Sequence, residues 1–370
     1  MMRIFNKFSM LLMVCSIVIV SCSDDSKTDD IVTKDYDFSK ILEQFVDHTI
    51  VPTYTEMKDN SKLLLVKVAE FEKSGSQVDL DAACEYWKTT RAPWEKGEAF
   101  LFGPAAYNNL DPLLDSWPLD KNQLDQVLDG NHDLTADFVR DGLGAVLRGF
   151  HTVEYLLFED GAPRDVTKYT LREKQYLTAV SEVLRDDTLK LWALWDGGTS
   201  EKALLEDLGI EIGTPYGDEF KKAGNIGSRY LSQSDAVDEI LQGMINIADE
   251  VANGKIADPH TSNNVLEVES WFSWNSLVDF QNNIRSIENS YLGGTTVATR
   301  KVSISTFVKE KNEALDTEIK GLITDAISAI DAIPSPFRNN LQASQVQTAM
   351  DAVNELKEII ETKVRPLIVN

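Results

Sequence analysis

The chain has 370 residues and a formal net charge of −24, and 43% of its residues are hydrophobic. This length and apolar content are sufficient for one or two packed cores. The strong negative charge argues against binding to nucleic acid or docking on anionic lipid, since both surfaces repel an acidic protein. The charge is compatible with attracting cations, although a solvated acidic surface explains it equally simply.

The first 21 residues predict an export signal. Arg3 and Lys7 precede an apolar run from Phe8 to Val20, which is shorter than the ~20 residues that a membrane-spanning helix needs. The run ends in Ile19-Val20-Ser21-Cys22, which resembles a bacterial lipobox, so we expect Cys22 to be lipidated. An uncleaved anchor or an ordinary secretory peptide are the alternatives. The expectation is an exported lipoprotein at the outer membrane of a Gram-negative bacterium, with the lipid as its only contact with the membrane.

Residues 22–34 are polar and acidic and predict a flexible tether between the anchor and the folded part. Cys15 leaves with the signal and Cys22 carries the lipid, so Cys84 is the one cysteine left in the mature chain. We therefore expect no disulfide, even in a compartment that permits one.

Helical patterns dominate from residue 35 onward, and no stretch shows the sustained alternation of a strand. The prediction is an all-α fold of two helical-bundle domains packed together, residues 35–196 and 197–370, divided at Gly197-Gly198. The expected helices cover roughly 37–73, 79–103, 120–128, 134–159, 167–195, 216–222, 234–253, 262–291, 303–332 and 340–366.

The expected helix 79–103 carries an unusual set of polar residues. Arg91, Glu95 and Glu98 share one helix face next to Trp94, and Pro93 should bend the helix there. A solvated ladder of ion pairs would contribute only about 0.3–0.5 kcal/mol per pair. The neighbouring tryptophan makes a solvated face a poor explanation.

The expected helix 134–159 contains Gly149, His151 and Glu154. His151 and Glu154 are three residues apart and border the apolar stripe of that helix, where a carboxylate is costly to bury unless it is paired. A glycine inside a helix costs roughly 1 kcal/mol relative to alanine. Gly149 and Gly144 therefore indicate a close approach by another element or a ligand.

The expected helix 262–291 is rich in Ser, Asn and Asp, which are poor residues for a helix interior. Glu269 and Ser273 would share a face there with Ser276 and Phe280. This density predicts hydrogen bonds between helices or a ligand surface.

Together these segments resemble the imelysin family, also called M75 peptidase-like, whose hallmark is a Gly-x-His-x-x-Glu motif. Gly149, His151 and Glu154 match the motif. The supporting blocks are Arg91 through Pro104, Trp117-Pro118-Leu119-Asp120, and Glu269 through Gly293. The resemblance implies two helical bundles, an exported location and a site at the domain junction. It also implies a link to iron uptake, with other iron-uptake components as partners, and a peptidase activity for some members.

The expected site is lined by Arg91, Trp94, Glu95, Glu98, Gly149, Glu269 and Ser273 around His151 and Glu154. His151 and Glu154 could bind iron, an iron-bearing small ligand or zinc. A catalytic zinc usually has three protein ligands, so a third would come from Glu95, Glu98 or Glu269. The zincin pattern His-Glu-x-x-His is absent, since Tyr155 stands four residues after His151.

Four interpretations of the His151–Glu154 pair therefore stay open. The pair could hold a metal ion, serve a metallopeptidase as catalytic residues, act as a metal-free acid/base couple, or form a buried polar network that fixes helix register. The whole chain could instead be a surface scaffold or a polysaccharide-binding module. His48, His132 and His260 have no motif around them and predict ordinary positions. Phosphate-binding loops, Rossmann fingerprints, EF-hands and Cys-x-x-Cys pairs are absent from the sequence.

Overall fold

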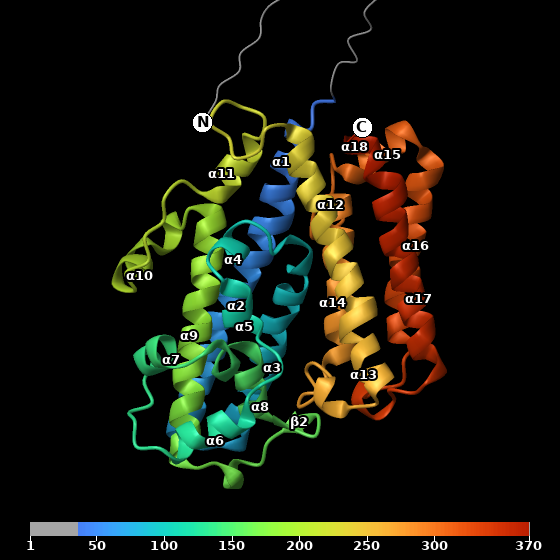
Figure 1. Ribbon diagram of the computed structural model, residues 1–370. Helices are drawn as coiled ribbons and strands as arrows, with labels where there is room; N and C mark the ends of the chain where they lie inside the picture. The colour runs from blue at the N-terminus through green and yellow to red at the C-terminus, as the bar shows by residue number, and fades with distance from the viewer. Residues whose placement is uncertain (1–35, 370) are drawn as a thin grey trace, which may run out of the picture. The chain divides into compact units, whose positions relative to one another are not determined.

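A computed structural model describes residues 36–369, and most of that part of the chain is helical (Figure 1). The all-α prediction is confirmed. The described residues contain only two strands, β1 (Phe158–Glu159) and β2 (Ala162–Pro163), which pair antiparallel in a short hairpin. The predicted signal, the tether and Cys22 lie outside the described residues and stay predictions. None of the described helices is both long and apolar enough to cross a membrane.

The helices up to Asp196 are organised around three long ones, which pack along each other. Gly75 ends the first of them in the left-handed conformation (φ +62°), and Ser76 caps the second by accepting a hydrogen bond from the Asp79 amide. The elements are α1 (Ser39–Phe45), α2 (Val51–Ser74), α3 (Gln77–Glu95), α4 (Pro104–Tyr107), α5 (Leu110–Asp115), α6 (Lys121–Asp129), α7 (Ala136–Gly142), α8 (Gly149–Leu157) and α9 (Leu171–Asp196).

The helices after Asp196 form a second group, in which α12, α14, α16 and α17 pack side by side (Figure 1). The elements are α10 (Lys202–Asp207), α11 (Tyr216–Lys221), α12 (Gln233–Glu250), α13 (Ala257–Ser262), α14 (Ser276–Leu292), α15 (Ile304–Lys311), α16 (Glu313–Asp331), α17 (Ser344–Ile359) and α18 (Pro366–Val369). A single π-helical turn, Val251–Lys255, continues α12 at its C-terminal end.

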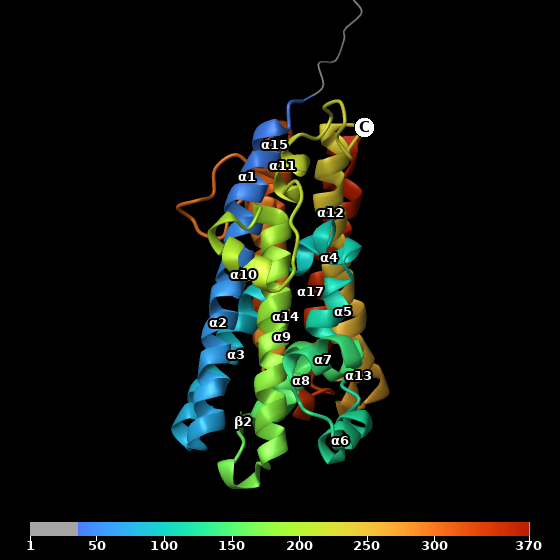
Figure 2. The ribbon, with the colours of Figure 1, turned by 90° about the vertical axis from the view of Figure 1, so that its left-hand side faces the viewer.

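The two groups meet where α3 and the following 3₁₀ turn, Glu98–Phe100, pack against α12 and α14. The approach is closest at Gly243 of α12, where a Cβ atom would lie 2.0 Å from the Ala99 carbonyl oxygen. Within the first group, α5, α7 and α8 pack against α9 (Figure 2). Residues Asp37–Asn370 form one compact unit, and the predicted boundary between residues 196 and 197 stays a prediction.

The stretch 303–332 is divided at Asn312 into α15 and α16. Three other predicted helices are wrong in their extent. The stretch 134–159 is broken, since α7 ends at Gly142, a 3₁₀ turn covers Ala145–Leu147 and α8 begins at Gly149. Gly142 and Gly144 explain the break, because two glycines this close make a helix interior unfavourable. The stretch 79–103 ends earlier than predicted, at Glu95, with Pro93 in its last turn.

The third error concerns residues 262–291, of which only α14 from Ser276 onward is a long helix. Residues 268–275 are irregular, and Ser270 (φ +54°) and Trp274 (φ +59°) both adopt the left-handed conformation. The predicted shared helix face of Glu269, Ser273 and Ser276 therefore does not exist. Part of the Ser- and Asn-rich composition belongs to this loop, as in the hydrogen bond from Ser276 Oγ to the Glu269 carbonyl (2.5 Å). The rest lies in α14, where Asn283 Nδ2 donates to Glu95 Oε2 of α3 (2.5 Å), a hydrogen bond between helices as predicted.

Candidate functional site

The site begins with the way α8 starts. Gly149 has φ +80°, and a Cβ atom there would lie 2.3 Å from the carbonyl oxygen of Leu114. Only glycine combines this backbone conformation with so close an approach. The start of α8 therefore abuts the end of α5, where Asp115 follows Leu114, and this contact brings Asp115 beside His151.

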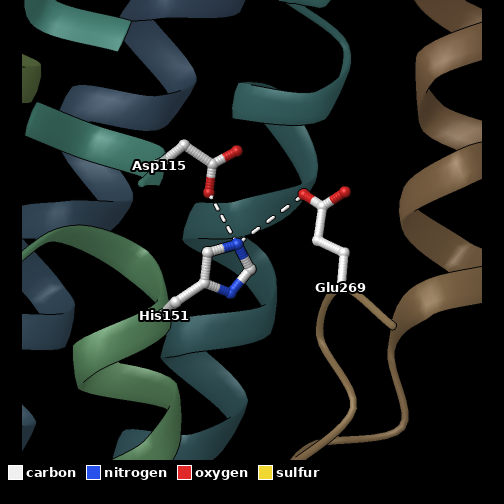
Figure 3. Close-up of side chains that lie close together, drawn as sticks. All are labelled: Asp115, His151 and Glu269. Carbon is white, nitrogen blue, oxygen red and sulfur yellow. Dashed lines mark ion pairs between the residues drawn. The ribbon is translucent and has the colours of Figure 1, made fainter. Parts of the chain in front are cut away.

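The two ring nitrogens of His151 face different surroundings. Nδ1 lies 3.1 Å from Glu154 Oε2, one turn along α8. Nε2 lies 3.1 Å from Asp115 Oδ1 and 3.7 Å from Glu269 Oε1, and Figure 3 shows both carboxylates directed at that nitrogen. Nε2 has no aligned hydrogen-bond partner among the described residues, although the side chain is buried.

Glu154 completes the Nδ1 side. Its Oε1 accepts hydrogen bonds from the backbone amide (2.9 Å) and the hydroxyl (2.7 Å) of Ser273. Both residues are buried, and the irregular segment 268–275 places the Ser273 donors toward α8. The carboxylate is thus held by three contacts, which fixes the orientation of the imidazole.

Arg91 of α3 is the main counter-charge on the Nε2 side. Its guanidinium is fully buried and forms ion pairs with Asp115, with Glu95 Oε1 (2.5 Å) and with Glu269 Oε1 (2.6 Å). Its Nε lies 3.6 Å from Asp279 Oδ2 of α14. Arg91 therefore contacts carboxylates from α3, α5, α14 and the loop before α14.

Trp94 and Lys255 extend this network. Trp94 Nε1 donates a hydrogen bond to Asp115 Oδ2 (2.6 Å), and Lys255 Nζ lies 3.0 Å from Glu269 Oε2. The same ammonium lies 3.9 Å from Glu98 Oε1. Lys255 belongs to the π-helical turn that follows α12, and such turns are frequent at functional sites.

The surrounding charges shift the pKa values of His151 and of the two carboxylates beside its Nε2 atom. Burial alone would lower the pKa of His151, but the Asp115 and Glu154 carboxylates raise it well above 6.5. Burial alone would raise the pKa of Glu269, but Lys255, His151 and Arg91 lower it to about 2. Arg91 and His151 likewise hold the pKa of Asp115 well below its usual range despite burial. His151 is therefore a cation between ionised carboxylates at neutral pH.

The pKa values of three other carboxyl groups in the cluster are raised. Burial raises the pKa of Glu95 to about 8 and that of Asp279 to about 6, despite the nearby Arg91. Burial raises the pKa of Glu98 well above 4.5, despite Lys255. The cluster thus contains more carboxyl groups than cationic groups: the carboxyls are Glu95, Glu98, Asp115, Glu154, Glu269 and Asp279, and the cations are Arg91, Lys255 and His151.

Two sets of side chains have ligand atoms close enough to share one metal ion, with all atoms of a set within 4.8 Å of one another. One set is Asp115, His151 and Glu269, and the other is Glu95, Glu98 and Asp115. The first offers one imidazole nitrogen and two carboxylate oxygens, a mixture that suits borderline cations such as ferrous iron and zinc. The imidazole nitrogen in this set makes it the better fit for such cations.

An acidic cavity of about 550 Å³ adjoins these residues. Its wall includes Asp115, Glu269, Glu98 and Lys255 from the cluster and Trp117, whose ring centroid lies 4.8 Å from that of His151. Four further carboxylates line it: Asp111, Glu250, Asp258 and Glu267. Small solutes and cations can therefore approach the cluster from this cavity.

The structure brings together every site residue that the sequence predicted. Arg91, Glu95 and Glu269 are in direct contact, Trp94 and Gly149 position Asp115, and Ser273 binds Glu154. Glu98 lines the cavity. Glu154 lies at Nδ1, away from the set of ligand atoms around Nε2.

Sequence reasoning missed four polar residues of the cluster: Asp115, Lys255, Asp279 and Asn283. Asn283 Nδ2 donates to Glu95 Oε2 (2.5 Å), and Asn275 Nδ2 donates to Asp279 Oδ1 (2.7 Å). Asp115 lies just before the Trp117-Pro118 block, and Asp279 and Asn283 lie within the Ser- and Asn-rich stretch. These positions were the available signals. Nothing in the local sequence marks Lys255.

The fold and the site together define an all-α protein with a buried histidine–carboxylate centre between two groups of helices. The family model for Imelysin matches residues 50–362. The chain therefore belongs to the imelysin family.

Several relatives match over most of the chain. "Iron-regulated protein A" of Synechococcus elongatus is 26% identical over 334 residues, covering 89% of this chain and 86% of the relative. A crystal structure of an iron-regulated protein A precursor from Parabacteroides distasonis is 35% identical, with a TM-score of 0.80, and the match covers 90% of this chain and 95% of that one. An imelysin-like protein from Psychrobacter arcticum has a TM-score of 0.64 at 13% identity over 90% of this chain and 97% of that one, so it supports the fold alone.

Proposed function

We propose that the protein binds a metal ion, with iron as its physiological metal, through Asp115, His151 Nε2 and Glu269. The observation that carries this proposal is the buried Nε2 atom, which has no aligned hydrogen-bond partner and lies 3.1 Å from one carboxylate and 3.7 Å from another. Asp115 stabilises the protonated ring as an ion pair, and a metal ion that displaced the Nε2 proton would find the same two carboxylates beside it. The iron assignment is supported by the name of the Synechococcus elongatus relative.

Glu154 supports the site from behind rather than as a ligand. If a metal ion displaced the Nε2 proton, the proton left on Nδ1 would donate to Glu154 and the Nε2 lone pair would face Asp115 and Glu269. Metal-bound histidines commonly donate their other ring N–H to a carboxylate in this way. This arrangement replaces the predicted His151–Glu154 ligand pair with a three-residue set.

The positive charge of Arg91 opposes a cation at Nε2, since Arg91 pairs with the same oxygens of Asp115 and Glu269. The surplus of carboxyl groups offsets this repulsion. When a metal ion binds, Asp279 remains beside Arg91, and Glu95, whose pKa burial raises to about 8, can lose its proton there to balance the charge.

Calorimetric titration with ferrous and zinc ions, the former under anaerobic conditions, tests the proposal. Wild type should bind one ion, and His151→Ala should lose at least tenfold in affinity. His132→Ala is the matched control, because His132 is exposed and stacks on Phe138 outside the cluster. Equal affinities for wild type and His151→Ala would remove the metal role.

A metal-dependent peptidase is the second candidate. It is favoured by the number of possible ligands, since three protein ligands with access for water are typical of catalytic zinc. The acidic cavity beside Asp115 and Glu269 gives such access. Hydrolysis of casein that a chelator abolishes and zinc restores, and that His151→Ala lacks, would support this activity. Casein left intact by the zinc-loaded protein would contradict it.

The protein acts at a membrane surface in this proposal, as an exported lipoprotein held through Cys22. The support is the lipobox-like sequence before Cys22, which lies outside the described residues. Cys22→Ser should release the protein from the membrane fraction and abolish metabolic labelling with palmitate. Retention of both properties would exclude this anchor.

A further inference from the structure

A second cavity, larger than the acidic one, lies on the other side of Trp117. Its volume is about 1130 Å³, and it shares Trp117, Pro118, Leu266 and Glu267 with the acidic cavity. Its wall also contains Tyr155 of α8, Trp271 and Phe272 of the irregular loop, and Arg338 of the 3₁₀ turn Phe337–Asn339. We call this cavity the aromatic groove.

The aromatic side chains of the groove form a connected series. Trp271 stacks on Phe272 with ring centroids 4.4 Å apart, Tyr155 packs edge-on against Phe272 at 5.1 Å, and Trp117 lies 6.3 Å from Phe272. All four are partly exposed. Partly exposed rings that line a large cavity provide flat apolar surfaces for a planar ligand.

Arg338 is the charge in this groove with donors to spare. Its guanidinium lies over the Trp271 ring, 4.1 Å from the centroid. Nη1 makes two long contacts, at 3.5 Å to the Trp271 carbonyl oxygen and at 3.6 Å to Asp160. Nη2 donates no hydrogen bond to residues 36–369. Its buried Nε also has no partner within that part of the chain. An anion in the groove could accept a hydrogen bond from Nη2.

The remaining charges of the groove are already committed to partners. Arg164 pairs with Glu173 (3.0 Å) and Lys121 with Asp125 (2.6 Å). Among the acids, Glu159 pairs with Lys168, Asp120 caps α6, and Glu267 accepts hydrogen bonds from Ser262 and Asn264. Asp160 is the acid nearest to Arg338, at 3.6 Å from Nη1, and its side chain is 80% exposed. Arg338 Nη2 is therefore a cationic donor that none of the acids lining the groove engages.

We propose that the aromatic groove is a second ligand site, which binds a small planar aromatic acid. The ring would pack against the Trp271, Phe272 and Tyr155 side chains, and the carboxylate would accept hydrogen bonds from Arg338. The site is separate from the metal centre and does not depend on it, since none of the groove residues belongs to the set Asp115, His151 and Glu269.

Binding of 2-naphthoate tests this inference, because the compound is planar, anionic, fluorescent and a weak chelator. Wild type should bind 2-naphthoate at least tenfold more tightly than 2-naphthamide, which lacks the charge, or cyclohexanecarboxylate, which lacks the aromatic ring. This comparison needs no variant. Equal binding of the three compounds, or none of 2-naphthoate, would overturn the proposal.

Variants then locate the site. Arg338→Gln and Trp271→Leu should each weaken binding of 2-naphthoate about tenfold. Arg229→Gln is the matched control, since Arg229 also lies over an aromatic ring, that of Tyr107 at 4.5 Å, but does not line the groove. Addition of EDTA should leave 2-naphthoate binding unchanged, so failure of the metal proposal and failure of this one are distinguishable. Unchanged binding by Arg338→Gln, with wild-type circular dichroism, would contradict the assignment.

Discussion

The two sides of the His151 imidazole are built on opposite principles. On the Nδ1 side, every polar group has a partner, since Glu154 accepts from the amide and hydroxyl of Ser273 while contacting the ring. On the Nε2 side, Asp115 and Glu269 lie within ion-pair distance, yet the nitrogen has no aligned hydrogen bond among the described residues. The Nδ1 side, which we call the closed side, is a hydrogen-bonded network. The Nε2 side, which we call the open side, is an ion-paired cluster whose Asp115 and Glu269 line the acidic cavity.

A buried centre can thus hold a ring rigidly on one side and keep partly neutralised charge on the other. The closed side fixes the position and tautomer of the ring, because a carboxylate held by several donors has little freedom. The open side concentrates charge that the protein only partly neutralises, with Arg91 and Lys255 facing several carboxyl groups. Variants that disturb one side alone can separate these two contributions.

The largest effect should come from Arg91→Met, which removes the counter-charge of the open side. Four carboxyl groups lie around this guanidinium: Glu95, Asp115, Glu269 and Asp279. Breaking a buried ion pair by removing one partner typically costs about 3–5 kcal/mol. We expect a loss of that size in the free energy of unfolding, measured with urea at pH 7. At pH 4 the loss should shrink, because the remaining carboxyl groups can then take up protons.

Arg365→Met is the control for this variant. Arg365 forms a two-pronged pair with Asp238 (2.6 and 2.9 Å), but its side chain is 36% exposed. An exposed pair contributes about 0–1 kcal/mol. If both variants lost the same small amount, the counter-charge role of Arg91 would be wrong.

The second prediction concerns Gly149, which sets the geometry of the open side. In Gly149→Ala the new Cβ would lie 2.3 Å from the Leu114 carbonyl oxygen, in a backbone with φ +80°. Strain of this kind costs about 1–3 kcal/mol, and relief of the clash would move Asp115 relative to His151. We expect lower stability in urea together with weaker metal binding.

Gly144→Ala is the matched control, because Gly144 lies in the segment that connects α7 to α8. A Cβ atom at Gly144 meets nothing within 4 Å, and its φ of −74° suits alanine. This variant should be as stable as wild type or slightly more stable, by about 0.4–1 kcal/mol. Equal behaviour of the two alanine variants would show that α8 does not need the close approach to α5.

The same comparison explains what the sequence could predict. Periodicity was sufficient for the all-α fold and for a helix such as α12, whose buried residues Val237, Ile240, Leu241 and Met244 form one apolar stripe. It failed at 143–148 and 268–275, where glycines and left-handed residues break the helix. In both places the tertiary contacts made by the site, such as Gly149 on Leu114, outweigh local helix preference.

The residues of the closed side were predictable and some of those on the open side were not. His151 and Glu154 are neighbours on one helix, so their spacing alone places them together. Asp115 and Lys255 come from different elements, α5 and the turn after α12, and meet only through packing. No local spacing reports such a contact, which is why the third ligand was sought among Glu95, Glu98 and Glu269.

The third prediction uses the charge on the open side. Because the Asp115 and Glu154 carboxylates raise the pKa of His151 well above 6.5 despite its burial, a metal ion must displace a proton from Nε2 at neutral pH. Metal affinity should therefore rise about tenfold per pH unit from pH 5 to 7, until the pH reaches the folded-state pKa. In the metal-free protein the sign is reversed. The stability contributed by protonated His151 is fully present below about pH 6.5 and is lost as the pH rises through the folded-state value.

Calorimetry in buffers of different ionisation enthalpy measures this proton release directly. Wild type should release close to one proton per ion at pH 7, and urea unfolding of the metal-free protein should show stability falling above the folded-state pKa. His151→Ala supplies the reference without this group. An affinity that does not change between pH 5 and 7 would contradict Nε2 as the metal ligand.

The smallest expected effect belongs to the closed side. In Glu154→Gln the carboxylate that holds Nδ1 is replaced by an amide of the same shape, so the ring keeps its place but loses a charged acceptor. Outer-shell partners of metal ligands typically contribute 10–100-fold to affinity, and we expect about tenfold here. Ser273→Ala should lose less, because the Ser273 amide still donates to Glu154. Metal titration of both variants ranks them, and a loss in Glu154→Gln as large as that in His151→Ala would mean that Glu154 binds the metal itself.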